Sequence, residues 1–298
     1  MGIDRFKKKK SYVVFGLAVV VVFFMLFLFQ DGEKSKPGYP IKRLVQYGFQ
    51  IENRSNEVAK DVEFWTYAPV KQTSTQKFKK LSVSHPYDLT EDEFGNQVIH
   101  MKFDFIPPFA TKIVSIQAEL LMSDVPNPLI IEKNNDFLRA EKHIEVKHDA
   151  IKKAASLFSG TAESDVKAIY KWTADHIQGV AYVREDRGAL YALQNKSGDC
   201  TEYTYLFTAV CRAKGIPARP LGGYIMNENG RLVAENYHNW AEFYLNGAWH
   251  VADSQMKVFM ERPSRFIAMN IISDPMHNAM GEAQRFRFTG KNIHVKVR

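Results

Sequence analysis

Apolar and polar residues alternate with a period of two soon after residue 40. Every odd-numbered position over residues 45–51 is apolar, and the positions between them are polar or glycine. This alternation is typical of a β-strand with one buried face. The same style of pattern returns in the ranges 62–68, 99–105 and 114–120. We therefore expect a small β-sandwich over residues 41–123.

The character of the chain changes from about residue 126. Ser164 or Asp165 is suited to cap a helix, whose apolar face contains Val166, Ile169, Tyr170, Thr173 and Ile177. A second helix is expected to start near Cys200 and to end at Gly215, where a Gly–Ile–Pro sequence stops it. Strand-like segments follow in the ranges 219–225, 238–245 and 248–252. Residues 124–298 are therefore predicted to form an α+β domain, with helices first and an antiparallel sheet afterwards.

An unbroken uncharged run of 18 residues, Tyr12–Phe29, lies near the start of the sequence. A helix of this length covers about 27 Å, close to the hydrocarbon thickness of a bilayer. The run is longer than the apolar part of a cleaved signal peptide, and no Ala-x-Ala follows it. We predict a basic tail and a retained transmembrane anchor in residues 1–30, with a cleaved signal or a buried core helix as alternatives. Residues 31–40 are predicted to be a linker.

The charge distribution gives this anchor an expected orientation. The net charge is +7, and residues 1–30 carry +4 of it through Arg5 and Lys7–Lys10, less Asp4. Positive residues before a span keep the N-terminus in the cytoplasm. The protein is thus expected to be a single-pass protein of the inner or plasma membrane, with the remaining domains periplasmic or extracellular. No basic helix and no interleaving of basic and aromatic residues is found, which argues against nucleic-acid binding.

The two cysteines have different surroundings. Cys200 follows the polar segment 196–199 and precedes an apolar helical pattern, so we predict it at a helix N-terminus. There the helix dipole favours thiolate, the nucleophilic form, and backbone N–H groups can hold an oxyanion. The alternative is a small buried hydrophobe, which is the usual role of a free cysteine and our interpretation of Cys211. On one helix the two would lie roughly 16 Å apart, too far for a disulfide.

A predicted hairpin brings a histidine and an aspartate together. Asn246–Gly247 is the preferred centre of a two-residue turn. If Leu245 faces Ala248 across that turn, His238 and Asp253 become diagonal neighbours on one face of adjacent strands. Their Cβ atoms would then lie roughly 7–8 Å apart or less, within reach of a hydrogen bond. A histidine that takes a thiol proton and is oriented by a carboxylate is what nucleophilic catalysis requires; a chance pair on a surface hairpin is the alternative.

Residues 160–255 resemble the transglutaminase-like superfamily and keep its order of Cys, His and Asp. The resemblance in the nucleophile block is carried by Gly198, Asp199, Cys200, Leu206, Phe207, Ala209, Cys211, Arg212, Gly215–Arg219 and Gly222–Tyr224. In the histidine and aspartate blocks it is carried by His238, Trp240, Glu242, Tyr244, Gly247, Trp249 and Asp253. The preceding strands are similar to a module often found before this core in bacterial members. The chain thus resembles a bacterial, membrane-anchored member.

This resemblance implies a papain-like fold, with a cysteine on a helix packed against a sheet that bears His and Asp. The expected fold class is α+β, a papain-like transglutaminase core preceded by a small β-sandwich and an N-terminal transmembrane helix. The implied roles are nucleophile for Cys200, general base and acid for His238, and orienting group for Asp253. Tyr182 and Gln194 are candidates for the oxyanion site, against core packing and a solvated loop respectively.

Other residues are expected to have structural roles. Arg219 is a candidate for a structural ion pair. The histidines other than His238 show no metal-ligand spacing, so neither a metal nor another cofactor is expected.

The predicted activity is cysteine-dependent acyl transfer, through a thioester on Cys200, to a peptide or protein substrate that offers Gln, Asn or a peptide bond. Water as acceptor gives hydrolysis or deamidation, and an amine gives transamidation; bulk water at an exported site favours hydrolysis. Two alternatives stand beside this enzyme. One is a catalytically silent module that binds peptide or glycan at the cell surface, and the other is a protein whose β-sandwich recruits a partner.

Overall fold

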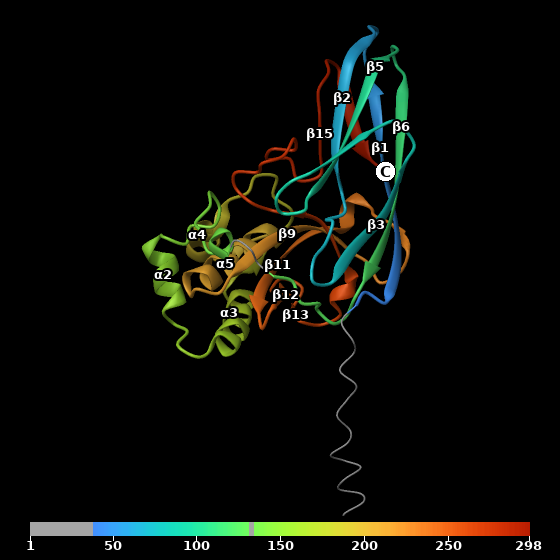
Figure 1. Ribbon diagram of the computed structural model, residues 1–298. Coiled ribbons are helices and arrows are strands. Elements are labelled where there is room, and N and C mark those ends of the chain that lie inside the picture. The colour runs from blue at the N-terminus through green and yellow to red at the C-terminus, as the bar shows by residue number, and fades with distance from the viewer. Residues whose placement is uncertain (1–37, 131–133) are drawn as a thin grey trace, which may run out of the picture. The chain divides into compact units, whose positions relative to one another are not determined.

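The computed structural model describes residues 38–130 and 134–298, which form a mixed arrangement of sheets and α-helices (Figure 1). The predicted membrane anchor in residues 1–30 lies outside the described residues. Within the described part of the chain, no helix combines the length and the apolar character that crossing a bilayer requires.

Two sheets form the β-sandwich. The first, the β1 sheet, has the order β10-β1-β6-β3, with β16 also paired to β1, and the second, the β2 sheet, has the order β15-β2-β5-β4. Their longer strands are β1 (Ile41–Asn53), β2 (Ala59–Ala68), β3 (Gln76–Val83), β5 (Gln97–Ile106) and β6 (Thr111–Met122), with the short β4 (Asp88–Glu91). Inward-facing residues such as Val45, Phe64 and Met101 belong to one buried cluster. The strands expected from period-two alternation are therefore confirmed.

Three strands of the sandwich come from beyond residue 123. β10 (Gly230–Arg231) and β16 (Ile293–Val297) pair with β1, and β15 (Phe286–Phe288) pairs with β2. The range expected for the sandwich, 41–123, thus leaves out strands that its sheets contain. The reason is physical: β10 and β15 are too short to display a period-two pattern, and their pairing is decided by distant residues.

A third sheet lies beside the sandwich and carries the candidate site. This β11 sheet has the order β13-β12-β11-β9-β14, and its pairs are antiparallel, as predicted. Its strands are β9 (Ala218–Ile225), β11 (Tyr237–Leu245), β12 (Ala248–Asp253), β13 (Val258–Phe259) and β14 (Phe266–Ile271). One face packs against helices through Leu206, Phe207 and Phe243, and the other packs around Trp240 together with Val70, which follows β2. Figure 1 shows the sheet between the helices and the sandwich.

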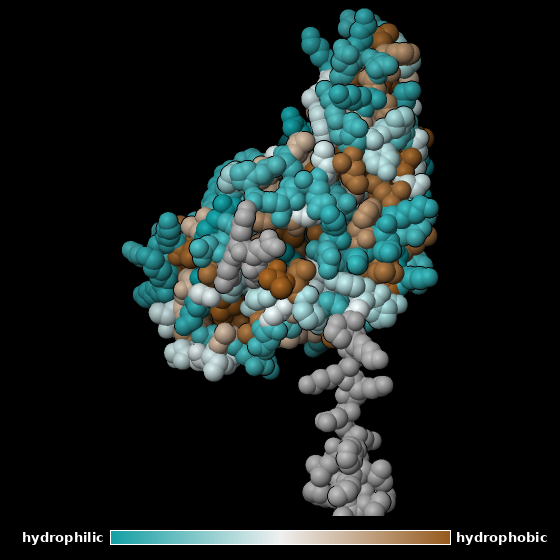
Figure 2. Space-filling model, viewed as in Figure 1, coloured by the Kyte–Doolittle hydropathy of each residue, from teal (hydrophilic) through white to brown (hydrophobic). Residues whose placement is uncertain are grey.

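The helices cover one side of the β11 sheet. They are α2 (Asp149–Ala155), α3 (Ala162–His176), α4 (Gly188–Asn195) and α5 (Cys200–Ala213), with 3-10 turns at Asn134–Phe137, Ala234–Asn236 and Pro263–Arg265. A small parallel pair, β7 (Gln178–Gly179) and β8 (Ser197–Gly198), precedes α5. Hydrophilic and hydrophobic side chains are mixed over the visible surface of the sandwich and of the part that contains the helices (Figure 2).

Helix α3 begins earlier than predicted. Its N-cap is Thr161, whose hydroxyl accepts a hydrogen bond from the Ser164 backbone N–H at 3.3 Å. The expected cap at Ser164 or Asp165 is therefore wrong. Asp165 is instead buried, where it accepts from the Gly160 N–H at 2.8 Å and pairs with Lys214 at 3.3 Å. A threonine three positions upstream is an equally good capping residue, and the sequence alone did not choose between them.

Candidate active site

The N-terminus of α5 presents Cys200. The helix begins at this residue, as predicted, with Asp199 as its N-cap. Asp199 Oδ1 accepts from the Thr201 N–H at 2.9 Å, and Glu202 Oε2 accepts from the Asp199 N–H at 3.0 Å. The Asp199 side chain also accepts from the Glu202 backbone N–H, and this reciprocal pair of Asp199 and Glu202 is a capping box. It satisfies backbone donors that a helix start leaves free. Cys200 is a free thiol of intermediate exposure, so it is positioned for reaction without being sealed in the core.

The glycine two positions before the cysteine has a steric reason. A Cβ added at Gly198 would overlap the side chain of Glu202. The Gly198 carbonyl accepts from the Val180 N–H at 3.0 Å, and Asp199 Oδ2 accepts from the Val183 N–H at 2.8 Å. These two hydrogen bonds hold residues 180–183 against the two residues that precede Cys200.

The β11–β12 hairpin has the predicted register. Asn246 and Gly247 both have positive φ, 52° and 84°, as a type I′ turn requires. Leu245 pairs with Ala248, and the register carries His238 and Asp253 to the same face. His238 Nε2–H donates to Asp253 Oδ2 at 2.7 Å.

Both oxygens of the Asp253 carboxylate have partners. Asp253 is 2% exposed, and its Oδ1 accepts from the Met256 backbone N–H at 3.0 Å. Its orientation is therefore fixed by the backbone just after β12, which in turn fixes the ring of His238.

His238 links this carboxylate to the cysteine. Burial alone would lower the pKa of His238, but hydrogen bonds to Asp253 and Cys200, and their negative charges, outweigh burial and raise the pKa to about 10. Because Nε2 is engaged by Asp253, Nδ1 is the ring atom left for the thiol. The imidazole is thus placed to exchange a proton with the Cys200 sulfur at the start of the helix. The arrangement can therefore support nucleophilic attack and proton transfer.

Two contacts that sequence reasoning missed hold this group in place. Asn239 Nδ2 donates to Thr201 Oγ1 at 3.0 Å, which ties β11 to the first turn of α5. Arg187 pairs with the buried carboxylate of Glu202 at 2.7 Å. Glu202 had a readable signal, since an acidic residue three positions after an Asp N-cap completes a capping-box pattern. The Asn239 contact had none, because it depends on how the strand and the helix meet.

The two oxyanion candidates lie at the surface. Tyr182 is 71% exposed, and Gln194 is an exposed residue near the end of α4. Within residues 38–130 and 134–298, neither side chain hydrogen-bonds to Cys200, His238 or Asp253.

The structural expectations for two other residues are confirmed. Arg219 pairs with Glu242 at 2.6 Å, and its guanidinium lies 4.1 Å from the centre of the Trp249 ring. Cys211 is fully buried and free, and burial raises the pKa of its thiol well above the ordinary value.

A family model matches the region that contains these residues. Residues 151–254, which contain Cys200, His238 and Asp253, match the family model described as the transglutaminase-like superfamily. These residues form a transglutaminase-like domain. The human kyphoscoliosis peptidase is 32% identical over 98 residues, which is 30% of this chain but only 15% of that protein. The aligned part of that curated relative is therefore a small portion of its length.

The transglutaminase-like domain and the sandwich together resemble a solved structure. A proposed cysteine protease from Cytophaga hutchinsonii has a TM-score of 0.57 at 17% identity, covering 87% of this chain and 92% of the other. The periplasmic domain of TgpA from Pseudomonas aeruginosa has a TM-score of 0.37 at 16% identity, covering 68% and 88%. The first of these shows that the fold extends beyond the matched domain into the sandwich.

Proposed function

We propose that this protein is a cysteine-dependent hydrolase or acyltransferase that acts on peptide or carboxamide substrates. The observation that carries the proposal is the linkage of Cys200, His238 and Asp253 at the start of α5, with the 2.7 Å His–Asp hydrogen bond. The transglutaminase-like family match over residues 151–254 supports cysteine chemistry at this position.

The reaction follows from the three groups. The Cys200 thiolate attacks the carbonyl carbon of the substrate, and the carbonyl oxygen becomes an oxyanion. His238 gives its proton to the leaving amine or ammonia as the C–N bond breaks, and a thioester remains on Cys200. An acceptor water or amine then loses a proton to His238 and attacks the thioester, which releases the product and restores the thiolate. Asp253 keeps the imidazole ring oriented throughout.

The backbone of Cys200 is the best-placed donor for the oxyanion. As the first residue of α5, its N–H has no helical partner, and among the described residues it makes no other backbone hydrogen bond. Such a donor beside the nucleophile is suited to a developing negative charge. The surface positions of Tyr182 and Gln194 make the backbone a better candidate than either side chain.

Water is the proposed acceptor, and the proposed location is outside the cytoplasm. The location rests on the apolar run at residues 12–29 and its basic flank. At an exported site, bulk water competes with any amine, which favours hydrolysis of a peptide or side-chain amide.

Deleting the sandwich residues 41–123 is not a suitable test of this function. Because β10, β15 and β16 pair with β1 and β2, deletion of residues 41–123 would leave those three strands without partners. Point substitutions in the full chain are therefore the appropriate test.

The deciding experiment is mass spectrometry of Cys200 after exposure of the full chain to Gln- and Asn-containing peptides. We expect a thioester adduct on Cys200 with release of ammonia or amine. Cys200→Ala and His238→Ala should each abolish turnover while the circular dichroism spectrum stays native. Iodoacetamide near neutral pH should label Cys200 and leave buried Cys211 unmodified. Turnover that persists in Cys200→Ala would remove the enzyme proposal, and peptide binding without any adduct would favour a silent binding module.

A further inference from the structure

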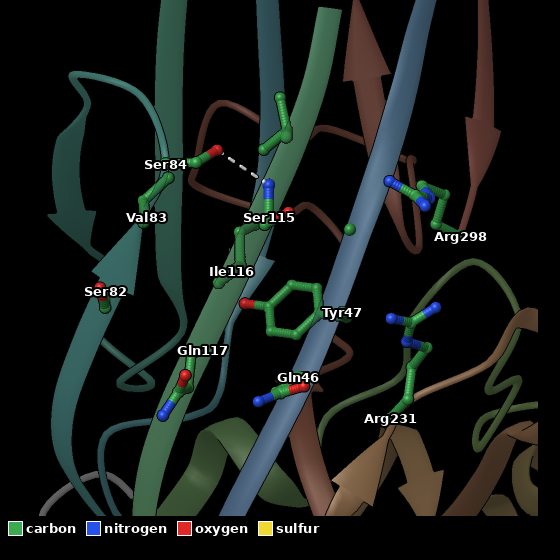
Figure 3. Close-up of a pocket in the computed structure, with 12 residues that line it drawn as sticks. Gln46, Tyr47, Ser82, Val83, Ser84, Ser115, Ile116, Gln117, Arg231 and Arg298 are labelled. Atoms are coloured by element: carbon green, nitrogen blue, oxygen red, sulfur yellow. Dashed lines mark hydrogen bonds between the residues drawn. The ribbon is translucent and has the colours of Figure 1, made fainter.

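The β1 sheet carries a polar groove on its outer face, and Cys200, His238 and Asp253 are not among the residues that line it. The groove has a volume of about 310 Å³, at the lower end of the roughly 300–1,000 Å³ typical of small-molecule sites. Figure 3 shows its lining side chains across the strands, with Arg231 and Arg298 on one side, Ser82 and Ser84 on the other, and Ser115 between them. None of the lining residues has a carboxyl side chain.

Strand register arranges the groove in two rows. In the first row Arg231 pairs with Gln46, Gln46 with Gln117, and Gln117 with Ser82, across β10, β1, β6 and β3. Side chains in register on one face of a sheet lie side by side, so this row presents one guanidinium, two amides and a hydroxyl.

The second row runs beside the first and creates the hollow. The Arg298 N–H donates to the Gly48 carbonyl at 2.8 Å, Gly48 pairs with Ser115, and the Ser115 N–H donates to Ser84 Oγ at 2.9 Å. A Cβ at Gly48 would overlap the Val114 carbonyl, so the close approach of the two strands requires glycine here. This row therefore has no side chain at Gly48, between the serine hydroxyls and the second guanidinium.

No carboxylate side chain neutralises the two arginines in the part of the chain that the structure describes. Within residues 38–130 and 134–298, neither guanidinium has an Asp or Glu carboxylate at salt-bridge distance. Both side chains are exposed at the same edge of the groove. Guanidinium groups recognise carboxylates through paired, charge-assisted hydrogen bonds, so this edge is complementary to an acid group.

The rest of the groove favours a ligand rich in hydroxyls. The backbones of β1 and β6 are paired with each other along both rows, so few backbone groups remain for an extended peptide, which is usually bound at a free strand edge. The apolar lining residues Val114 and Ile116 are buried under the sheet surface. Recognition must therefore come from amides, hydroxyls and guanidinium groups, and the volume exceeds what a single inorganic ion would fill.

We propose that this groove binds an acidic saccharide of one or two rings, with its carboxylate on Arg231 and Arg298 and its hydroxyls on the glutamines and serines. The site does not depend on catalysis at Cys200. The groove is connected to the candidate active site through the backbone, because Arg231 lies in the connection between β9 and β11. The residue after Arg231 donates its N–H to the Gln46 carbonyl at 2.7 Å.

The test is isothermal titration calorimetry of the full chain in detergent with a glucuronic-acid-containing disaccharide. The matched ligand is the same disaccharide with its carboxyl reduced to an alcohol. We expect the acidic form to bind at least about tenfold more tightly, since a charge-assisted contact is lost on reduction. Arg231→Gln and Arg298→Gln should each weaken binding by about tenfold, and added salt should weaken it further.

Control variants separate the groove from general charge and from folding. Lys102→Gln removes one positive charge from an exposed position on the β2 sheet and should leave binding unchanged. Ser115→Leu fills the hollow from an exposed position and should abolish binding with an unchanged melting temperature. Equal affinity for the reduced disaccharide, for inorganic phosphate or for acetyl-Glu-Glu-amide would overturn the proposal. So would the absence of binding, or binding that the arginine variants do not alter.

Discussion

Glu202 and Asp199 hold the first turn of α5 between them, with Cys200 inside that turn. The Glu202 carboxylate accepts from the backbone of Asp199 at 3.0 Å and from the Arg187 guanidinium at 2.7 Å, while it is itself 1% exposed. One buried carboxylate therefore connects the start of the helix to the loop before α4.

Replacement of Glu202 should cost substantial stability. Glu202→Ala leaves the Arg187 charge without its partner and removes half of the capping box, so we expect the free energy of unfolding to fall by about 3 kcal/mol. Urea denaturation measures this change. Glu163→Ala, at an exposed position in the first turn of α3, is the matched control and should change stability by less than about 0.5 kcal/mol. Equal losses in the two variants would contradict the role assigned to Glu202.

The raised pKa of His238 predicts an alkaline limit to activity. Its pKa of about 10 lies above the ordinary value of 6.5, so the imidazolium that protonates the leaving group persists through neutral pH. Turnover should fall as the pH rises through about 10. The stabilisation from this charge is fully present below about pH 6.5. It is lost as the pH rises toward about 10, because the folded state then no longer holds an extra proton.

Asp253→Asn tests the cause of this limit. The substitution removes the negative charge that helps to raise the pKa of His238, so the alkaline limb of the pH–rate profile should move to lower pH. The turnover number should fall by about a hundredfold or more, since the ring loses its orienting carboxylate. His148→Asn, an exposed N-cap position on α2, should leave the profile unaltered. A limb that stays in place in Asp253→Asn argues against the assigned link.

The second cysteine should affect stability alone. Cys211 is fully buried, and Cys211→Ser places a hydroxyl where the thiol is surrounded by apolar residues. We expect a loss of about 1–3 kcal/mol in the free energy of unfolding, with iodoacetamide labelling of Cys200 at its original rate. A clear drop in Cys200 labelling would show that the two positions on α5 are coupled.

The ion pair of Arg219 and Glu242 offers a double-mutant test. Arg219→Met leaves a buried carboxylate without its partner and should destabilise the fold by about 3–5 kcal/mol. Arg219→Met combined with Glu242→Leu removes both charges, and we expect it to recover much of that loss. Thermal or urea unfolding of the single and double variants measures the coupling. A double variant as unstable as the sum of the two single variants would contradict this prediction.

The features most accessible from the sequence were those fixed by local signals. The Asn246–Gly247 turn set the register of the β11–β12 hairpin, and that register placed His238 diagonally across from Asp253 on one face. The polar segment before an apolar helical pattern likewise located Cys200 at the start of α5. In both cases a short stretch of chain contains the whole physical cause.

Features that depend on distant pairing were not accessible. β10 and β15 have too few residues for a periodic pattern, whereas the alternation of β16 could have been recognised as a strand without revealing its partner. The Asn239–Thr201 contact and the two polar rows of the β1 sheet require the register of several strands at once. The pattern within a segment predicts its secondary structure, but not the segments with which it pairs or packs.

The pairing of β16 with β1 sets an order for folding during synthesis. β1 is made early, yet the edge that β16 covers stays open until residues 293–297 have left the ribosome. An exposed edge of this kind invites pairing with other chains. Chains that stop before β16, or whose synthesis is slow there, should therefore aggregate through β1, even though every residue of the cysteine site has already been made.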